Sequence, residues 1–134
     1  MESSYEILLE NVRCFAGRHE IPIRPLTLLV GENSAGKTTL LAIRAALFFS
    51  FPGKNFSELL DDLFNIPPYE LGNFATIFSR AASPRAKAFR IGSRKNGFQF
   101  DLEYSDRDSK PYPSDMALRF PDGLSIDSVE KLKP

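Results

Sequence analysis

Apolar side chains gather at the start of the chain in a pattern that predicts β-strands. Residues 5–15, YEILLENVRCF, are rich in β-branched and aromatic side chains and predict a strand. We expect residues 16–18 to form a turn and residues 19–23 to return as a second strand, with Pro22 at an edge or a bulge. Residues 26–30 form a continuous apolar run, which is typical of a strand covered on both faces.

The middle of the chain shows helical spacing instead. Residues 38–49 are apolar on almost every side, which predicts a helix buried between layers of the domain. Asn55 and Glu58 have the spacing of a capping box, and we expect them to begin a second helix that ends at residues 67–68. The apolar residues at helical spacing in that segment are Phe56, Leu59, Leu60, Leu63 and Phe64. Residues 69–80 are expected to hold a further short helix.

The last part of the chain predicts two β-hairpins. Asn96-Gly97 is a strong signal for a two-residue hairpin loop, and it joins two strands within residues 87–105. The register that follows pairs Phe89 with Tyr104, Arg90 with Glu103, Ile91 with Leu102, Arg94 with Gln99, and Lys95 with Phe98. Each pair combines side chains of compatible character, which supports this register. The second hairpin, within residues 117–126, has its loop at residues 121–123 and pairs Phe120 with Leu124 and Leu118 with Ile126.

Composition makes this a globular chain without a dominant charge. The 134 residues are 43% hydrophobic, so a single domain with a real core is expected. Lysine and arginine number 17, as do aspartate and glutamate, so no overall field attracts nucleic acid or membrane. The single cysteine, Cys14, excludes an internal disulfide and is expected to be a small apolar strand residue, because His19 is the only histidine. Without a signal peptide or a membrane-length apolar run, a cytoplasmic protein with no membrane contact is expected.

The chemistry of the chain is concentrated after the apolar run at residues 26–30. The segment Gly31, Glu32, Asn33, Ser34, Ala35, Gly36, Lys37 and Thr38 fits the phosphate-loop pattern G-x-x-x-x-G-K-[ST], and Thr39 adjoins it. Glycines let such a loop curl so that backbone N–H groups face an anion, and the following helix adds the positive end of its dipole. Lys37 would reach the β- and γ-phosphates, and the Thr38 hydroxyl would bind Mg²⁺.

The segment before this loop carries a resemblance. Asn11-Val12-Arg13-Cys14-Phe15, the short return strand and the phosphate loop together resemble the start of ABC-type ATPase heads of the SMC, RecF and OLD-like group, often called AAA family ATPases. Val12 stands in place of the usual aromatic residue and Ser34 in place of the usual glycine. The stretch YELGNFATIFSR…AKAFRIGS also resembles bacterial members implicated in phage defence, including ATPases of Septu-like and retron-linked systems.

The resemblance implies an α/β P-loop NTPase fold whose N-terminal lobe holds an antiparallel β-subdomain. Residues 1–134 would be one incomplete domain: a hairpin, phosphate-loop strand and helix over 1–50, a connection over 51–86, and hairpins over 87–126. It further implies that Arg13 contacts nucleotide phosphates and that ATP and Mg²⁺ are the cofactors. In the complete protein, two heads would form a homodimer around ATP, and hydrolysis would control a nuclease or DNA as partner.

Several parts of a complete ATPase head are not found in this sequence. A Walker B strand needs four apolar residues before its acidic pair, but Asp61 and Asp62 follow only two and sit in a helical pattern, so we expect a solvated helix face. No signature motif occurs either. Gln99, the only glutamine, is expected to be an exposed strand residue that faces Arg94 rather than a γ-phosphate sensor. The chain alone is therefore expected to bind nucleotide without turnover, and its catalytic residues are unknown.

Three other interpretations remain open on the sequence alone. The phosphate loop also suits a small phosphotransferase, for which Arg80 and Arg85 could serve as lid residues, or a non-hydrolysing nucleotide-binding module. A pure interaction domain is the third. Six basic residues between 80 and 95 could meet nucleic acid, but the expected pair of Arg90 with Glu103 favours a solvated strand surface. The choice of ATP over GTP rests on the resemblance.

Overall fold

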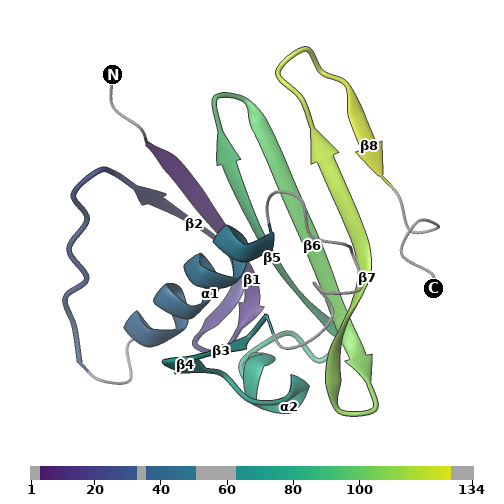
Figure 1. The fold of residues 1–134 in the computed structure, drawn as a ribbon. Coiled ribbons are helices and arrows are strands. Elements are labelled where there is room, and N and C mark those ends of the chain that lie inside the picture. Colours follow the sequence, from purple (N-terminus) through teal and green to yellow (C-terminus); the bar gives the residue numbers. More distant parts are fainter. Residues whose placement is uncertain (1–3, 33–35, 51–62, 128–134) are drawn as a thin grey trace.

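A single antiparallel sheet dominates the structure, a computed structural model that describes residues 4–32, 36–50 and 63–127 (Figure 1). Its strand order is β2-β1-β5-β6-β7-β8. The strands are β1 (Tyr5–Val12), β2 (Phe15–Ile23), β5 (Ala88–Lys95), β6 (Phe98–Arg107), β7 (Lys110–Arg119) and β8 (Ser125–Asp127). A small second sheet pairs β3 (Asn65–Ile66) with β4 (Tyr69–Glu70), and the helices are α1 (Lys37–Ser50) and α2 (Phe74–Ile77).

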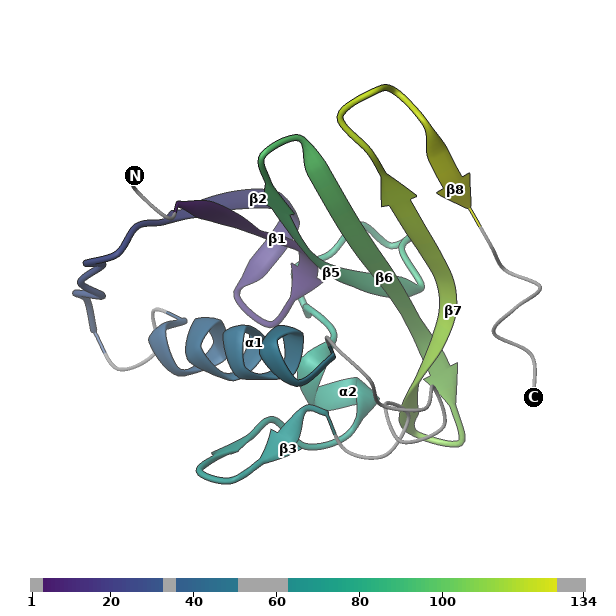
Figure 2. The same cartoon turned by 45° about the horizontal axis from the view of Figure 1, so that its top comes forward.

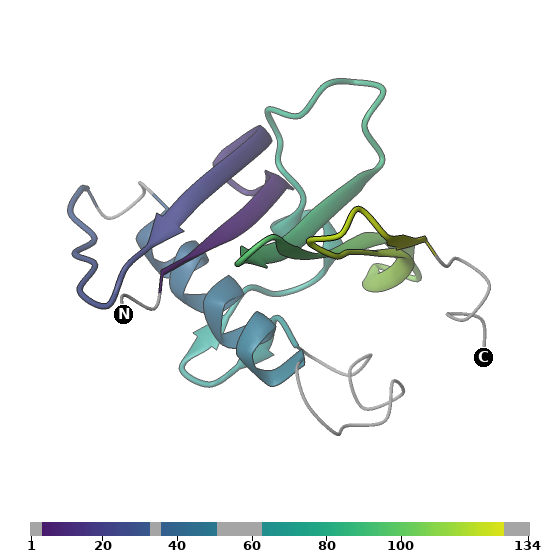
Figure 3. The same cartoon turned by 90° about the horizontal axis from the view of Figure 1, so that it is seen from above.

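Both helices and the small sheet cover the same face of the large sheet (Figure 2), and the view from above places α1 beneath strands β1 and β2 (Figure 3). The core lies between these layers and includes Ile7, Leu9, Val12, Leu40, Ala42, Ile43, Ala46, Leu47, Phe64, Phe74, Ile77, Phe89, Ile91, Phe100, Leu102 and Tyr104. A hydrogen bond of 3.0 Å from Arg44 Nε to the Tyr5 hydroxyl joins α1 to β1. Burial of these side chains between the large sheet and the elements that cover it is the main stabilising contribution to the fold.

The opposite face of the sheet is charged. Arg90 donates to the Glu103 carboxylate at 2.7 Å and lies 3.7 Å from that of Glu10, and Arg94 contacts the carboxylates of Glu6 and Glu20. Burial lowers the pKa of Arg90, but the hydrogen bond and the nearby carboxylates outweigh it, so the pKa is raised overall. The hydrogen bonds to Glu6 and Glu20 raise the pKa of Arg94.

The charged face therefore consists largely of ion-paired strand residues, as the Arg90–Glu103 pairing predicted. Two of the six basic residues between positions 80 and 95, Arg90 and Arg94, are held by carboxylates. Exposed ion pairs of this kind contribute little stability individually.

The first hairpin turns earlier than expected. The chain reverses at Arg13 and Cys14, so the predicted turn at residues 16–18 is wrong. Asn11 and Arg13 have positive φ angles of 58° and 48°, and the register of β1 against β2 shifts between Glu10 and Val12. Asparagine adopts this left-handed conformation more readily than most residues, which lets the reversal form without a glycine at its centre. β2 is an edge strand, as Pro22 predicted.

The apolar run at residues 26–30 is not a buried strand. Leu26, Leu28 and Val30 are 79%, 78% and 91% exposed. A strand needs a neighbour to satisfy its backbone groups, and no strand in the described ranges pairs with this segment, so the expectation of a strand covered on both faces is wrong. The helix after the loop forms over Lys37–Ser50, but its Thr38, Leu41 and Arg44 side chains are exposed, so only one of its faces is buried by the sheet.

The hairpin predicted around Asn96-Gly97 is confirmed in every predicted pair, from Phe89–Tyr104 to Lys95–Phe98. The second hairpin is confirmed by the pairing of Leu118 with Ile126 and by the Phe120 N–H bond to the Leu124 carbonyl at 2.9 Å. The short helix within residues 69–80 is α2, whose N-cap Asn73 accepts from the Thr76 N–H at 3.1 Å.

The helix predicted from Asn55 falls mostly outside the described residues, as do Glu58, Asp61 and Asp62. Its expected end does not form, because Leu63 and Phe64 lie in a turn before β3.

Candidate functional site

The phosphate loop leads directly into α1. Its residues Asn33, Ser34 and Ala35 lie outside the described part, whereas Gly31, Glu32, Gly36, Lys37, Thr38 and Thr39 are placed. The helix begins at Lys37, and the first bond that closes its initial turn runs from the Leu40 N–H to the Gly36 carbonyl at 2.9 Å. The Lys37 ammonium donates to the Gly31 carbonyl, so its side chain folds back across the loop. The two glycines and the lysine of the motif are thus gathered at the positive end of a helix of fourteen residues.

The residues around position 36 leave space only for a glycine. The φ angle of Gly36 is 91°, a conformation that L side chains rarely adopt. A Cβ atom at this position would lie 2.6 Å from Cys14 Sγ and 2.9 Å from Phe15 Cε2. The turn between β1 and β2 therefore fits against the last glycine of the loop and leaves no room for a side chain there.

Arg13 comes from that same turn and reaches the first turn of α1. Its Nη1 atom lies 3.4 Å from the hydroxyl of Thr39, which is 3% exposed. Its backbone N–H donates to the Ile77 carbonyl at 2.7 Å, which ties the turn to the end of α2. A guanidinium and a lysine ammonium thus lie at one helix N-terminus, which is an arrangement suited to a polyanion.

Among the described residues, no hydrogen bond joins Cys14 to His19 as a nucleophile–base pair would require. Cys14 is exposed in the turn, so the expectation of a small apolar strand residue is wrong. The His19 Nε2 atom lies 2.8 Å from the Ala16 carbonyl, and the ring packs edge-on against Phe15. Contact with Gly36 is the role that sequence reasoning missed for Cys14 and Phe15, and no local pattern signals it because the two segments are far apart in sequence.

Gln99 pairs with Arg94 in the sheet, as predicted, but it is buried rather than exposed. Its Nε2 atom donates to Asp101 Oδ2 at 2.6 Å, and both residues are 7% exposed. The two residues stand two apart on one strand, so they share the charged face, while Phe100 between them points into the core. The expectation of an exposed Gln99 is wrong because arginine and glutamate side chains crowd this face of the sheet.

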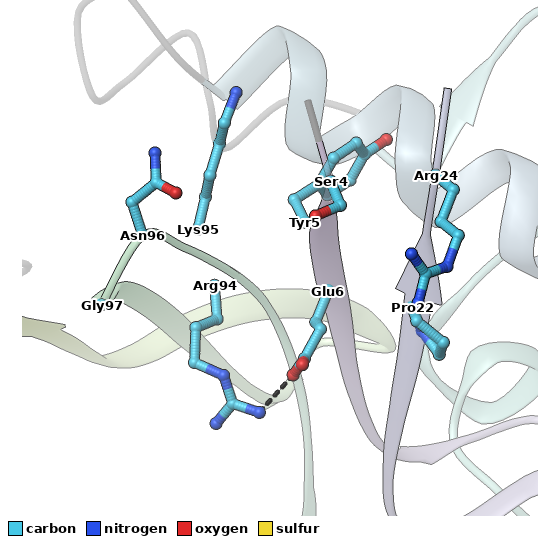
Figure 4. Close-up of a pocket in the computed structure, with 9 residues that line it drawn as sticks. All are labelled: Ser4, Tyr5, Glu6, Pro22, Arg24, Arg94, Lys95, Asn96 and Gly97. Atoms are coloured by element: carbon cyan, nitrogen blue, oxygen red, sulfur yellow. Dashed lines mark hydrogen bonds and ion pairs between the residues drawn. The ribbon is translucent and has the colours of Figure 1, made fainter. Parts of the chain in front are cut away.

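A pocket of about 310 Å³ lies at the other end of β1 from Arg13 (Figure 4). Its walls are Ser4, Tyr5, Glu6, Pro22, Arg24, Arg94, Lys95, Asn96 and Gly97. Figure 4 shows Arg94 directed at Glu6, so one of the cations that line this pocket is already bound to a carboxylate. Within the described ranges, no group of three or more histidine, cysteine, aspartate or glutamate residues is arranged to hold a metal ion.

A family model described as an AAA domain matches residues 6–126, which include the sheet, the phosphate loop and α1. The chain belongs to the AAA domain family. An OLD nuclease of Thermus scotoductus is 31% identical to this AAA domain over 129 residues, which covers 83% of the chain and 22% of that protein. The chain thus spans about a fifth of the length of this curated relative. No solved structure matches it at a significant level.

These similarities confirm the resemblance to ABC-type ATPase heads of the SMC, RecF and OLD-like group. They also agree with the architecture of this AAA domain, a mostly antiparallel sheet with few helices. None of the helices in the described residues has the length and apolar character needed to cross a membrane.

Proposed function

We propose that this AAA domain binds ATP with Mg²⁺ at the N-terminus of α1. The observation that carries the proposal is the convergence of three separate segments on one helix end: Arg13 from the β1–β2 turn, Gly31 at the start of the loop, and Lys37 at the first helical position. The close fit of Gly36 to Cys14 supports it, because the loop takes a shape that only glycine permits.

Each residue of the proposed site has a distinct task. Backbone N–H groups between Gly31 and Lys37 would face the phosphate oxygens, with Glu32, Asn33, Ser34 and Ala35 forming the body of the loop. Lys37 would leave the Gly31 carbonyl and move to the terminal phosphates. Thr38, whose side chain is exposed, would offer its hydroxyl to Mg²⁺, which bridges phosphate oxygens when bound. Arg13 and Thr39 would complete the wall beside the helix.

The wider function that we infer is ATP hydrolysis in the complete protein. Two heads in a homodimer would enclose ATP, and hydrolysis would control a nuclease or DNA as partner, in phage defence and in the cytoplasm. Similarity to a protein named OLD nuclease supports a link to nuclease activity. Turnover would also need a Walker B acidic pair and a signature motif, neither of which occurs in this sequence.

Calorimetric titration of the complete protein with ATP and GTP, with and without Mg²⁺, tests the proposal. Lys37→Ala should weaken ATP binding by about tenfold or more, because it removes charge-assisted contacts to phosphate. Lys95→Ala is the matched control, since it removes the same side chain at the far end of the sheet, in the pocket of Figure 4. Equal ATP affinity in Lys37→Ala and Lys95→Ala would refute the proposed site and leave an interaction domain as the better interpretation.

A further inference from the structure

Asn11 occupies an unusual position just before Arg13. Its φ angle is 58°, and it interrupts β1 where the register with β2 shifts. Its side-chain carbonyl Oδ1 accepts the Gly17 N–H at 2.8 Å, which links the two strands across the irregularity. Short polar side chains of this type relieve the cost of the left-handed conformation by bonding to nearby backbone. Asn11 therefore defines the bend that redirects the chain toward α1.

The backbone of the bend is also held by the end of α2 and by the segment that follows it. The Ser79 N–H donates to the Asn11 carbonyl at 2.9 Å, and the Arg13 N–H donates to the Ile77 carbonyl at 2.7 Å. These two bonds form an isolated antiparallel bridge between Val12 and Phe78. Val12 is fully buried, so this clamp is anchored in the core.

The side chain of Arg13 leaves this clamp in a defined direction. Arg13 has a positive φ angle of its own, 48°, and its guanidinium lies 3.4 Å from the Thr39 hydroxyl on α1. If Asn11 or Arg13 lost the left-handed backbone conformation, the guanidinium would move away from the N-terminus of α1. The backbone conformation of Asn11 thus determines the position of the Arg13 guanidinium.

We propose that Asn11 is a positioning residue for the nucleotide site and acts through Arg13. This inference rests on the proposed function, because Arg13 must contact the nucleotide for its position to matter. Asn11 itself bonds to residues outside the loop: its side chain accepts from Gly17 and its carbonyl accepts from Ser79. Its contribution is the geometry of the bend, supplied by one side-chain acceptor and two backbone bonds.

A double-mutant cycle on ATP affinity in the complete protein tests the inference. Arg13→Ala should weaken ATP binding by about tenfold, and Asn11→Ala by about fivefold. In the Arg13→Ala background, Asn11→Ala should have an effect of less than about twofold, because the group it positions is already gone. Asn11→Asp retains both the acceptor oxygen and the tolerance for positive φ, so it should restore ATP affinity to near that of the unmodified protein.

Asn96→Ala is the matched control. Asn96 also has a positive φ angle, 52°, but it lies in the β5–β6 turn at the other end of the sheet. Asn96→Ala should reduce thermal stability about as much as Asn11→Ala does, and it should leave ATP affinity unchanged. The inference is overturned if the Asn11→Ala and Arg13→Ala effects multiply, if Asn96→Ala weakens ATP binding equally, or if the folded Asn11→Ala protein binds ATP normally. Failure of the proposed function gives a different result, namely that Lys37→Ala and Arg13→Ala both leave ATP affinity intact.

Discussion

A Cβ atom at Gly36 would lie 2.6 Å from the Sγ atom of Cys14, closer than real Cβ atoms approach a neighbour. The loop and the β1–β2 turn are therefore in direct contact at the position where the loop enters α1. Because Cys14 adjoins Arg13, any shift of Gly36 would also move the arginine relative to the helix. Loop shape and arginine position are thus coupled by contact rather than by sequence proximity.

Replacing Gly36 by alanine should damage both stability and binding. The φ angle of 91° and the overlap with Cys14 and Phe15 together predict a loss of about 2 kcal/mol or more in the free energy of unfolding. ATP affinity should fall as well, because the loop must move to relieve the overlap. Urea unfolding and calorimetry measure the two effects.

Gly123→Ala is the control for the Gly36 variant, since Gly123 has a φ angle of 87° but no described atom within 4 Å of an added Cβ. It should cost only the backbone strain, about 1 kcal/mol, and leave ATP affinity unchanged. The steric argument would be contradicted by equal losses of stability in the two variants.

Tyr104 should make the domain sensitive to alkali. Burial raises the pKa of this tyrosine above its ordinary value of 10.0. Below pH 10 the hydroxyl is protonated in both the folded and the unfolded chain, so its contribution does not vary with pH. Above that value the unfolded chain loses the proton while the folded chain keeps it, so the free energy of unfolding falls by about 1.4 kcal/mol per pH unit until the folded pKa is reached.

Urea titrations at pH 8, 10 and 11 measure this dependence. Tyr104→Phe should flatten the decline between pH 10 and 11, whereas Tyr112→Phe, which alters a partly exposed ring on β7, should not. A decline of equal steepness in the Tyr104→Phe protein would show that other groups cause the alkaline instability.

The exposed apolar segment at residues 26–30 should promote self-association of the 134-residue chain when it is studied alone. Leu26, Leu28 and Val30 leave an apolar surface in water, and surfaces of this kind favour aggregation. Leu28→Lys should lower the weight-average mass in sedimentation velocity at high protein concentration. Leu124→Lys removes a 59% exposed leucine from the β7–β8 turn and should have a smaller effect. Identical sedimentation of the Leu28→Lys and unmodified chains would argue against this role for the segment.

The parts of the fold that local chemistry determines could be predicted from the sequence. Asn96-Gly97 specifies a two-residue turn, and the register of the whole β5–β6 hairpin follows from it. The β1–β2 turn could not be located in this way, because Gly17 is the more obvious turn residue and the reversal at Arg13 depends on bonds to Ile77 and Ser79, which are remote in sequence.

The residues of the candidate site could be predicted from a sequence motif, but their arrangement in space could not. The phosphate-loop pattern identifies Lys37 and Thr38, and the resemblance adds Arg13. The contact of Cys14 with Gly36 and the bend at Asn11 depend on how the hairpin packs on α1. The burial of residues 26–30 was predicted from their composition, yet composition describes what a segment favours and not whether a neighbour is there to cover it.

The charged face of the sheet also fixes how β1 and β5 align. A slip of two residues would keep every apolar side chain facing the core, so the hydrophobic pattern alone does not exclude it. In the observed alignment, Glu6 stands opposite Arg94, Leu8 opposite Gly92, and Glu10 opposite Arg90. A two-residue slip in either direction would set Leu8 against an arginine and separate a carboxylate from its cation. Charges that contribute little to stability thus select one alignment among several that the core would accept.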